Sequence, residues 1–138
     1  MKVVKQSNDV VAEIFWSDDG DLRAPVLRDA EGHCMQPFTH YLDAQIAALR
    51  KSEKVASAAR ASIEPMIYTL RGFAIYLMLA RTPLWHVDDD VLIAYRSWVR
   101  REVESNPRSR GVSHQIVDTV NGKLRQVYDF ICWCQLNH

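Results

Sequence analysis

The chain has 138 residues, 48% of them hydrophobic, and its 17 lysines and arginines balance its 17 aspartates and glutamates. This length and hydrophobic content favour one folded domain of ordinary size and exclude wholesale disorder. No apolar run approaches the roughly 20 residues of a membrane-spanning helix. With three cysteines, an odd number, and no signal peptide, we expect a cytoplasmic protein.

The charges are unevenly distributed along the chain. Residues 1–47 carry four cations and eight anions, whereas residues 48–138 carry 13 cations and nine anions. The phosphate backbone of a nucleic acid attracts a surplus of positive charge. The surplus of cations lies in the second, mostly helical part, whereas a net charge of zero does not favour a nucleic-acid site.

The first 36 residues predict a small β-hairpin arm. Residues 10–16 are β-prone and lead into the turn sequence Ser-Asp-Asp-Gly-Asp at 17–21. A second extended stretch, 25–27, leads to another turn at Glu31-Gly32. Whether this acidic arm packs on the rest of the chain, contacts a neighbouring subunit or repels DNA is left open.

Two helices are predicted next, at 37–51 and 62–81, because apolar residues recur there at intervals of three and four. Pro65 is expected in the first turn of the second helix, where its missing N–H is tolerated. The Ala- and Ser-rich stretch 53–61 is either a separate helical turn or a lead-in, and Pro83 should end the helix.

Two further helices complete the prediction. The third begins near Asp88, which suits an N-cap, and a loop follows at 105–112. The fourth runs from 113 to 135 and contains Gly122, a residue that often marks the close approach of another backbone. Long helices joined by short loops indicate a mainly α fold, a compact four-helix bundle.

The order and spacing of several apolar and polar residues carry a family pattern. In the second helix these are Ser62, Met66, Leu70, Phe73 and Leu77; after it come Trp85, Val87 and Tyr95; in the fourth helix they are Thr119, Asn121, Leu124, Phe130 and Trp133. Over about residues 37–138 the chain resembles the N-terminal core-binding domain, a SAM-like bundle, of tyrosine recombinases of the phage integrase family. Ser62 and Met66 depart from the usual Thr and aromatic residue.

The resemblance implies a division into an arm, 1–36, and a helical DNA-binding domain, 37–138. It implies binding of double-stranded DNA in DNA integration or recombination. The family's catalytic Arg, His-x-x-Arg and Tyr belong to a separate domain, and no His-x-x-Arg occurs here. We therefore expect no catalysis by this chain, a monomer in isolation, and a tetramer on DNA for a full-length protein.

Candidate DNA contacts gather before the second helix and around the start of the fourth. They are Lys51, Lys54, Arg60, Arg108, Arg110, Ser113, His114, Gln115, Asn121 and Lys123. A helix N-terminus offers free N–H groups to a phosphate, and Ser, Gln and Arg contact phosphates or base edges. The competing interpretation is a solvated loop and connector, with Ser113 as an ordinary N-cap and Asn121 as a structural residue.

No metal or other cofactor is expected. Cys132 and Cys134 lack the two-residue gap usual in zinc pairs, and on a helix their thiols point about 200° apart. The main alternative function is a helical protein-interaction domain without a nucleic-acid role, which an exposed apolar groove would support. A helix-turn-helix regulator is disfavoured, because no tight turn joins two short helices.

Overall fold

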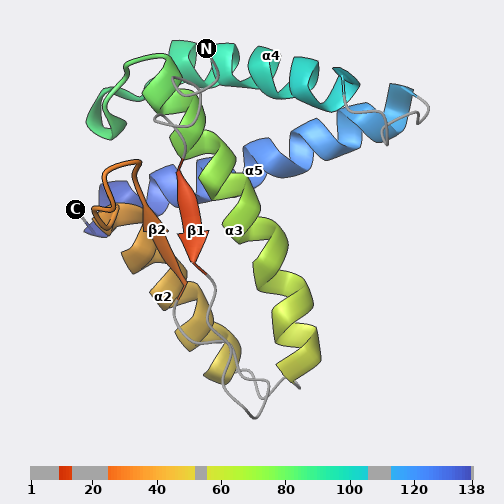
Figure 1. The fold of residues 1–138 in the computed structure, drawn as a ribbon. Coiled ribbons are helices and arrows are strands. Elements are labelled where there is room, and N and C mark those ends of the chain that lie inside the picture. The colour runs from red at the N-terminus through yellow and green to blue at the C-terminus, as the bar shows by residue number, and fades with distance from the viewer. Residues whose placement is uncertain (1–9, 14–24, 52–55, 106–112, 138) are drawn as a thin grey trace.

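Four long helices and a two-stranded hairpin form the part of the chain that the computed structural model describes, residues 10–13, 25–51, 56–105 and 113–137 (Figure 1). The elements in chain order are β1 (Val11–Glu13), β2 (Val26–Arg28), α2 (Gln36–Lys51), α3 (Ala56–Leu79), a short 3-10 turn η1 (Leu84–His86), α4 (Asp89–Ser105) and α5 (Ser113–Asn137). The mainly α fold with a small hairpin is therefore as predicted.

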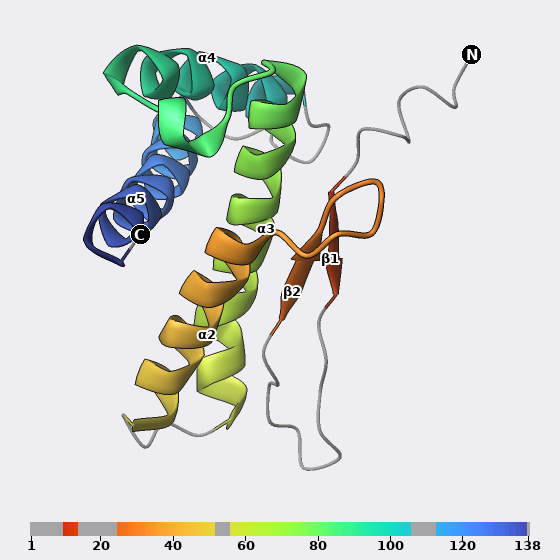
Figure 2. The same cartoon turned by 90° about the vertical axis from the view of Figure 1, so that its left-hand side faces the viewer.

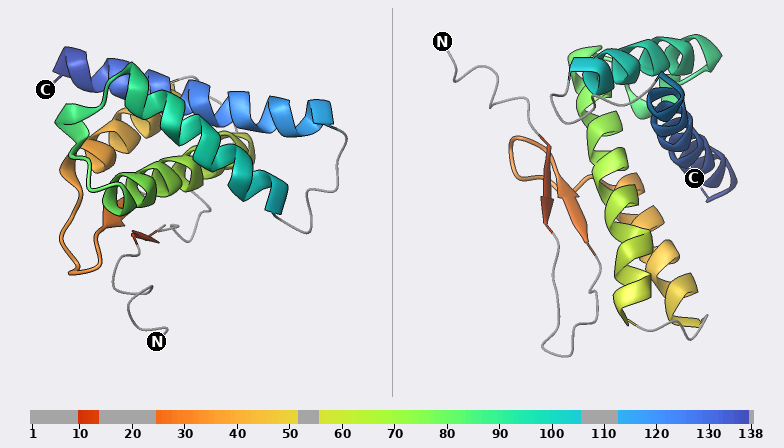
Figure 3. Two further views of the ribbon diagram at one scale, coloured as in Figure 1. Left: turned by 90° about the horizontal axis from the view of Figure 1, so that it is seen from above. Right: turned by 90° about the vertical axis from the view of Figure 1, so that its right-hand side faces the viewer.

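The helices α2 and α3 run in opposite directions and form the middle of the molecule. The hairpin covers one side of this pair, and α5 crosses the other side (Figures 2 and 3). Helix α4 lies across the end of α3 and beside α5 (Figure 1). None of the helices in these described ranges has the length and hydropathy needed to cross a membrane.

The hairpin is antiparallel, with Ala12 opposite Leu27, and the Arg28 Nε donates to Glu13 at 2.9 Å. Its expected turn at 17–21 lies outside the described residues. The second predicted turn is present, and Gly32 adopts a φ of 84° there. The Asp29 carboxylate accepts the backbone N–H of His33, which lowers the pKa of Asp29 below its ordinary value. Val10 and Leu27 are buried, so the hairpin contributes to the core.

Helix α3 begins earlier than expected, at Ala56. Most of the Ala- and Ser-rich stretch 53–61 therefore forms the first turns of this helix and is not a separate helical turn. The prediction that Pro65 lies in the first turn is wrong, because the proline sits in the helix interior. The proline removes one backbone hydrogen bond of the helix. The helix tolerates this loss because Pro65 is exposed. Alanine is the strongest helix former, which helps to extend the helix before the proline.

The end of α3 is closed by backbone hydrogen bonds. Thr82 N–H donates to the Leu77 carbonyl at 2.9 Å, and Arg81 N–H donates to Met78 at 3.1 Å. This pair of bonds is the Schellman arrangement. Arg81 takes a φ of 52° at the position where glycine is usual. Pro83 follows and prevents the helix from continuing, as predicted.

The predicted start of the third helix is confirmed. Asp88 accepts the backbone N–H of Val91 at 2.9 Å, which is the N-cap contact. Asp89 and Asp90 lie in the first turn of α4, where their charges complement the helix dipole.

Aromatic rings join the helices in two places. Between α2 and α5, Phe38 stacks on Phe130 with centroids 4.6 Å apart, and Tyr41 contacts the edge of the same ring. Between α3 and α4, the rings of Phe73 and Tyr95 are in contact, with centroids 5.0 Å apart. These contacts hold α4 and α5 against the central pair of helices.

Gly122 does not mark a close approach of another backbone, contrary to our expectation. It is exposed on α5, and a Cβ atom built there would meet nothing within 4 Å. Its absent side chain therefore has no packing reason in the described structure, and glycine only weakens the helix.

Replacing Gly122 by Ala should raise the free energy of unfolding by up to about 1 kcal/mol. Thermal denaturation should show a midpoint higher by about 3 °C. The control is Gly32→Ala, which should lower stability by about 1 kcal/mol because φ is positive there. A lower midpoint for Gly122→Ala would mean that this surface is packed after all.

Candidate nucleic-acid interface

The structure describes the side chains of some of the predicted DNA contacts. Lys51, Gln115 and Asn121 are exposed, and Lys123 is half-buried. Arg60, Ser113 and His114 lie in α3 and α5, but their side chains are not described. Lys54, Arg108 and Arg110 lie outside the described residues, so the predictions for these three remain predictions.

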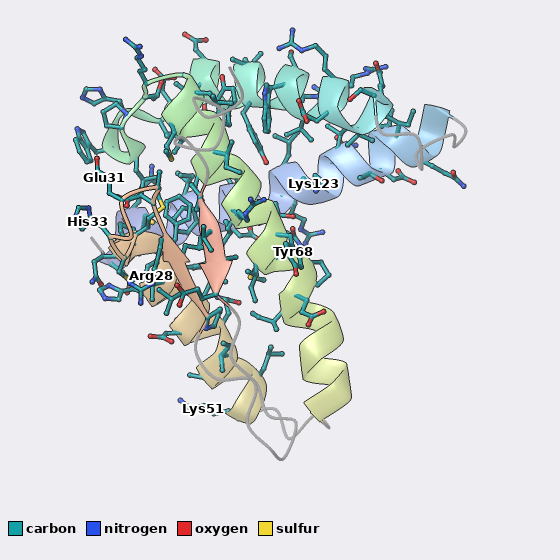
Figure 4. All side chains as sticks on the ribbon, viewed as in Figure 1. Arg28, Glu31, His33, Lys51, Tyr68 and Lys123 are labelled. Carbon is teal, nitrogen blue, oxygen red and sulfur yellow. The ribbon has the colours of Figure 1, made fainter. Side chains whose placement is uncertain are left out.

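The two described lysines are not neighbours. Lys51 ends α2, whereas Lys123 lies midway along α5, and Figure 4 shows them far apart on the molecule. Asn121 and Lys123 are two positions apart on one helix, so their side chains point about 200° apart. The structure therefore places Lys51, Asn121 and Lys123 on different surfaces of the molecule.

Lys123 lines a cleft of about 340 Å³ where α3, α4 and α5 meet. Figure 4 labels Tyr68 from α3 and Lys123 from α5, which both line this cleft. The other lining residues are Thr69, Gly72, Tyr95, Trp98, Val99, Glu102, Val103 and Thr119. The cleft thus combines a cation and an anion with aromatic and aliphatic walls.

The polar groups of the cleft differ in what they already contact. Thr119 Oγ1 donates to the Gln115 carbonyl at 2.9 Å, within α5. Burial raises the pKa of the Tyr95 phenol well above its ordinary value, so Tyr95 is neutral. Among the described residues Lys123 and Glu102 form no ion pair. These two charges are therefore available to a ligand.

Arg71 on α3 is engaged with the hairpin. Its Nε donates to the Val10 carbonyl at 2.7 Å and so ties the hairpin to α3. On α4, Arg100 pairs with Glu104 at 2.9 Å on an exposed surface. Arg101 is exposed and does not line the cleft.

No group of three potential metal ligands occurs in the described ranges. Cys132 and Cys134 are both half-buried on α5. Burial raises the pKa of the Cys134 thiol to about 11, so this thiol stays protonated at neutral pH.

The sequence reasoning missed most of the cleft. Lys123 was among the predicted contacts, whereas Tyr68, Trp98 and Glu102 were not. The signal that could have found the cleft is Gly72, a helix-weakening residue in the middle of an apolar helix. Even so, only the crossing of three helices brings these side chains together.

Comparisons with protein-family models, with curated proteins and with solved structures found no match to this chain.

Replacing Arg71 by Met should lower the free energy of unfolding by about 1–2 kcal/mol, because a charged donor to the Val10 carbonyl is lost. Methionine keeps much of the apolar stem, so urea denaturation reports mainly the hydrogen bond. The same change at the exposed Arg101 should stay within about 0.5 kcal/mol. Equal losses in the two variants would contradict the anchoring role of Arg71.

Proposed function

We propose that this chain binds double-stranded DNA through the side of the molecule where α3 and α5 meet, as the core-binding domain of a tyrosine recombinase. By itself it catalyses no strand cleavage. The observation that carries the proposal is Lys123, a half-buried residue of the cleft with no ion-pair partner among the described residues. A DNA phosphate would supply the counter-charge for its ammonium group.

The start of α5 supports the same interface. A helix N-terminus favours an anion through its backbone N–H groups and its positive dipole end, and Gln115 is exposed in the first turn of α5. The sequence adds Arg108 and Arg110 just before this helix. Contacts of this kind position a protein on the DNA backbone and carry little sequence information.

The family pattern adds support of a different kind. Leu70, Phe73, Tyr95 and Phe130, which contribute to the resemblance, are buried and join the helices to one another. Any helical bundle needs such a core, so this support is weaker than that of the cleft. Trp85, in contrast, is 81% exposed and takes no part in the core.

A second candidate function is a protein-interaction domain. A mostly apolar hollow of about 470 Å³ lies between the start of α2, the end of α3 and η1, and the exposed Trp85 lines it. An exposed apolar surface of this kind is typical of protein contacts. This hollow lies away from Lys123, so substitutions can separate the two functions.

The DNA-binding proposal is tested by fluorescence anisotropy with random-sequence duplex DNA at several salt concentrations. The unmodified chain should bind weakly, with an affinity that falls steeply as salt rises. Lys123→Ala should weaken binding by about tenfold, as the loss of a charged contact. It should also reduce the slope of log affinity against log salt by about 0.9.

The matched control is Arg101→Ala, which removes the same charge from an exposed position outside the cleft. Its affinity and salt slope should stay close to those of the unmodified chain. Identical behaviour of the two variants would contradict the assignment of the interface. Absence of binding at low salt would reject the proposed function in favour of protein interaction.

A further inference from the structure

The cleft has the size and wall chemistry of a small-molecule site. Its volume of about 340 Å³ lies at the lower end of the roughly 300–1,000 Å³ typical of ligand pockets. Helix α4 provides the apolar wall, with Trp98 and Tyr95 followed by Val99 and Val103. Trp98 and Val103 are partly exposed, whereas Tyr95 and Val99 are buried. Such walls suit a flat, partly apolar ligand.

Gly72 keeps the α3 side of the cleft open. It is the cleft residue without a side chain, and a Cβ atom built there would meet nothing within 4 Å. The backbone of α3 therefore borders free space at this point. A larger side chain at position 72 would enter the cleft without displacing a neighbour at its Cβ atom.

The mouth of the cleft carries groups without partners. The Tyr68 side chain is 57% exposed, and its ring stacks on no other ring in the described part of the chain. Lys123 and Glu102 line the same cleft and likewise have no ion pair there. An aromatic ring, a cation and a carboxylate thus line the same cleft.

These three groups match the face of the base, the edge of the base and the phosphate of a nucleotide. A base stacks on a tyrosine ring, a phosphate pairs with a lysine, and a carboxylate accepts a hydrogen bond from the exocyclic amino group of a base such as cytosine. A base within a duplex is stacked and paired and cannot enter a cleft between helices, whereas an unpaired base can.

We propose that the cleft between α3, α4 and α5 binds one unpaired nucleotide whose base bears an exocyclic amino group. The base lies against Tyr68 and the α4 wall, its amino group donates to Glu102, and its phosphate contacts Lys123. This inference rests on the proposed DNA-binding function and assigns a base-holding site to it.

The test uses dCMP and dUMP, which carry the same sugar and phosphate and differ at the position of the amino group. Two-dimensional ¹H–¹⁵N NMR of the full chain follows the amide signals of Gly72 and Lys123 during titration. Both signals should shift with dCMP, and dUMP should bind about tenfold more weakly because an oxygen acceptor replaces the amino donor that faces Glu102. Glu102→Gln should remove this preference, since an amide both donates and accepts.

A matched pair of glycine variants locates the site. Gly72→Leu should fill the cleft and abolish dCMP binding, whereas Gly122→Leu should leave it unchanged, because both glycines are helical and unobstructed but only Gly72 lines the cleft. Circular dichroism checks that both variants fold. Binding that survives Gly72→Leu, or no shift of either amide with dCMP, overturns the proposal.

Duplex DNA separates this inference from the proposed function. A duplex with one bulged deoxycytidine should bind more tightly than a fully paired duplex, and Gly72→Leu should remove only that difference. Duplex binding without any dCMP binding rejects the nucleotide site alone. Binding of dCMP without duplex binding rejects the proposed function and leaves the nucleotide site supported.

Discussion

Helix α3 has to bury side chains on two sides, because the hairpin packs against one side and α5 crosses the other (Figures 2 and 3). Its second half is accordingly rich in buried residues, among them Leu70, Phe73, Ala74 and Leu77. Arg71 also lies in this half, where its hydrogen bond to Val10 holds the hairpin in place. The hairpin, α4 and α5 are all held in position by contacts with α3, which is covered on two sides.

The cleft is a consequence of the same arrangement. Helix α4 crosses the end of α3, and the chain returns through α5 (Figure 1). The cleft lies where these three helices meet. Gly72 provides no side chain to fill that space. Tyr68 and Lys123 remain at its edge with no ring or ion-pair partner among the described residues. A requirement of packing thus leaves polar and aromatic groups available for binding.

The helices and the hairpin could be predicted because their signals are local. Pro83 ends α3 and Asp88 caps α4 through contacts within a few residues, which periodicity and capping rules capture. Pro65 was misplaced because a proline on an exposed side can be tolerated inside a long helix. The cleft could not be predicted, since Tyr68, Glu102 and Lys123 come together only through the crossing angles of three helices. Gly122 was misread because a glycine has the same sequence signal whether it faces a backbone or solvent.

The most direct measurement is NMR mapping of the whole chain with and without a short duplex DNA at low salt. The account predicts that the perturbed amides lie at Tyr68, Thr119, Lys123 and the start of α5, and that they recover when salt is added. The hairpin residues Arg28 and Glu31, labelled in Figure 4, should not change. Perturbations confined to the hairpin or to the surroundings of Trp85, or no perturbation at all, would contradict it.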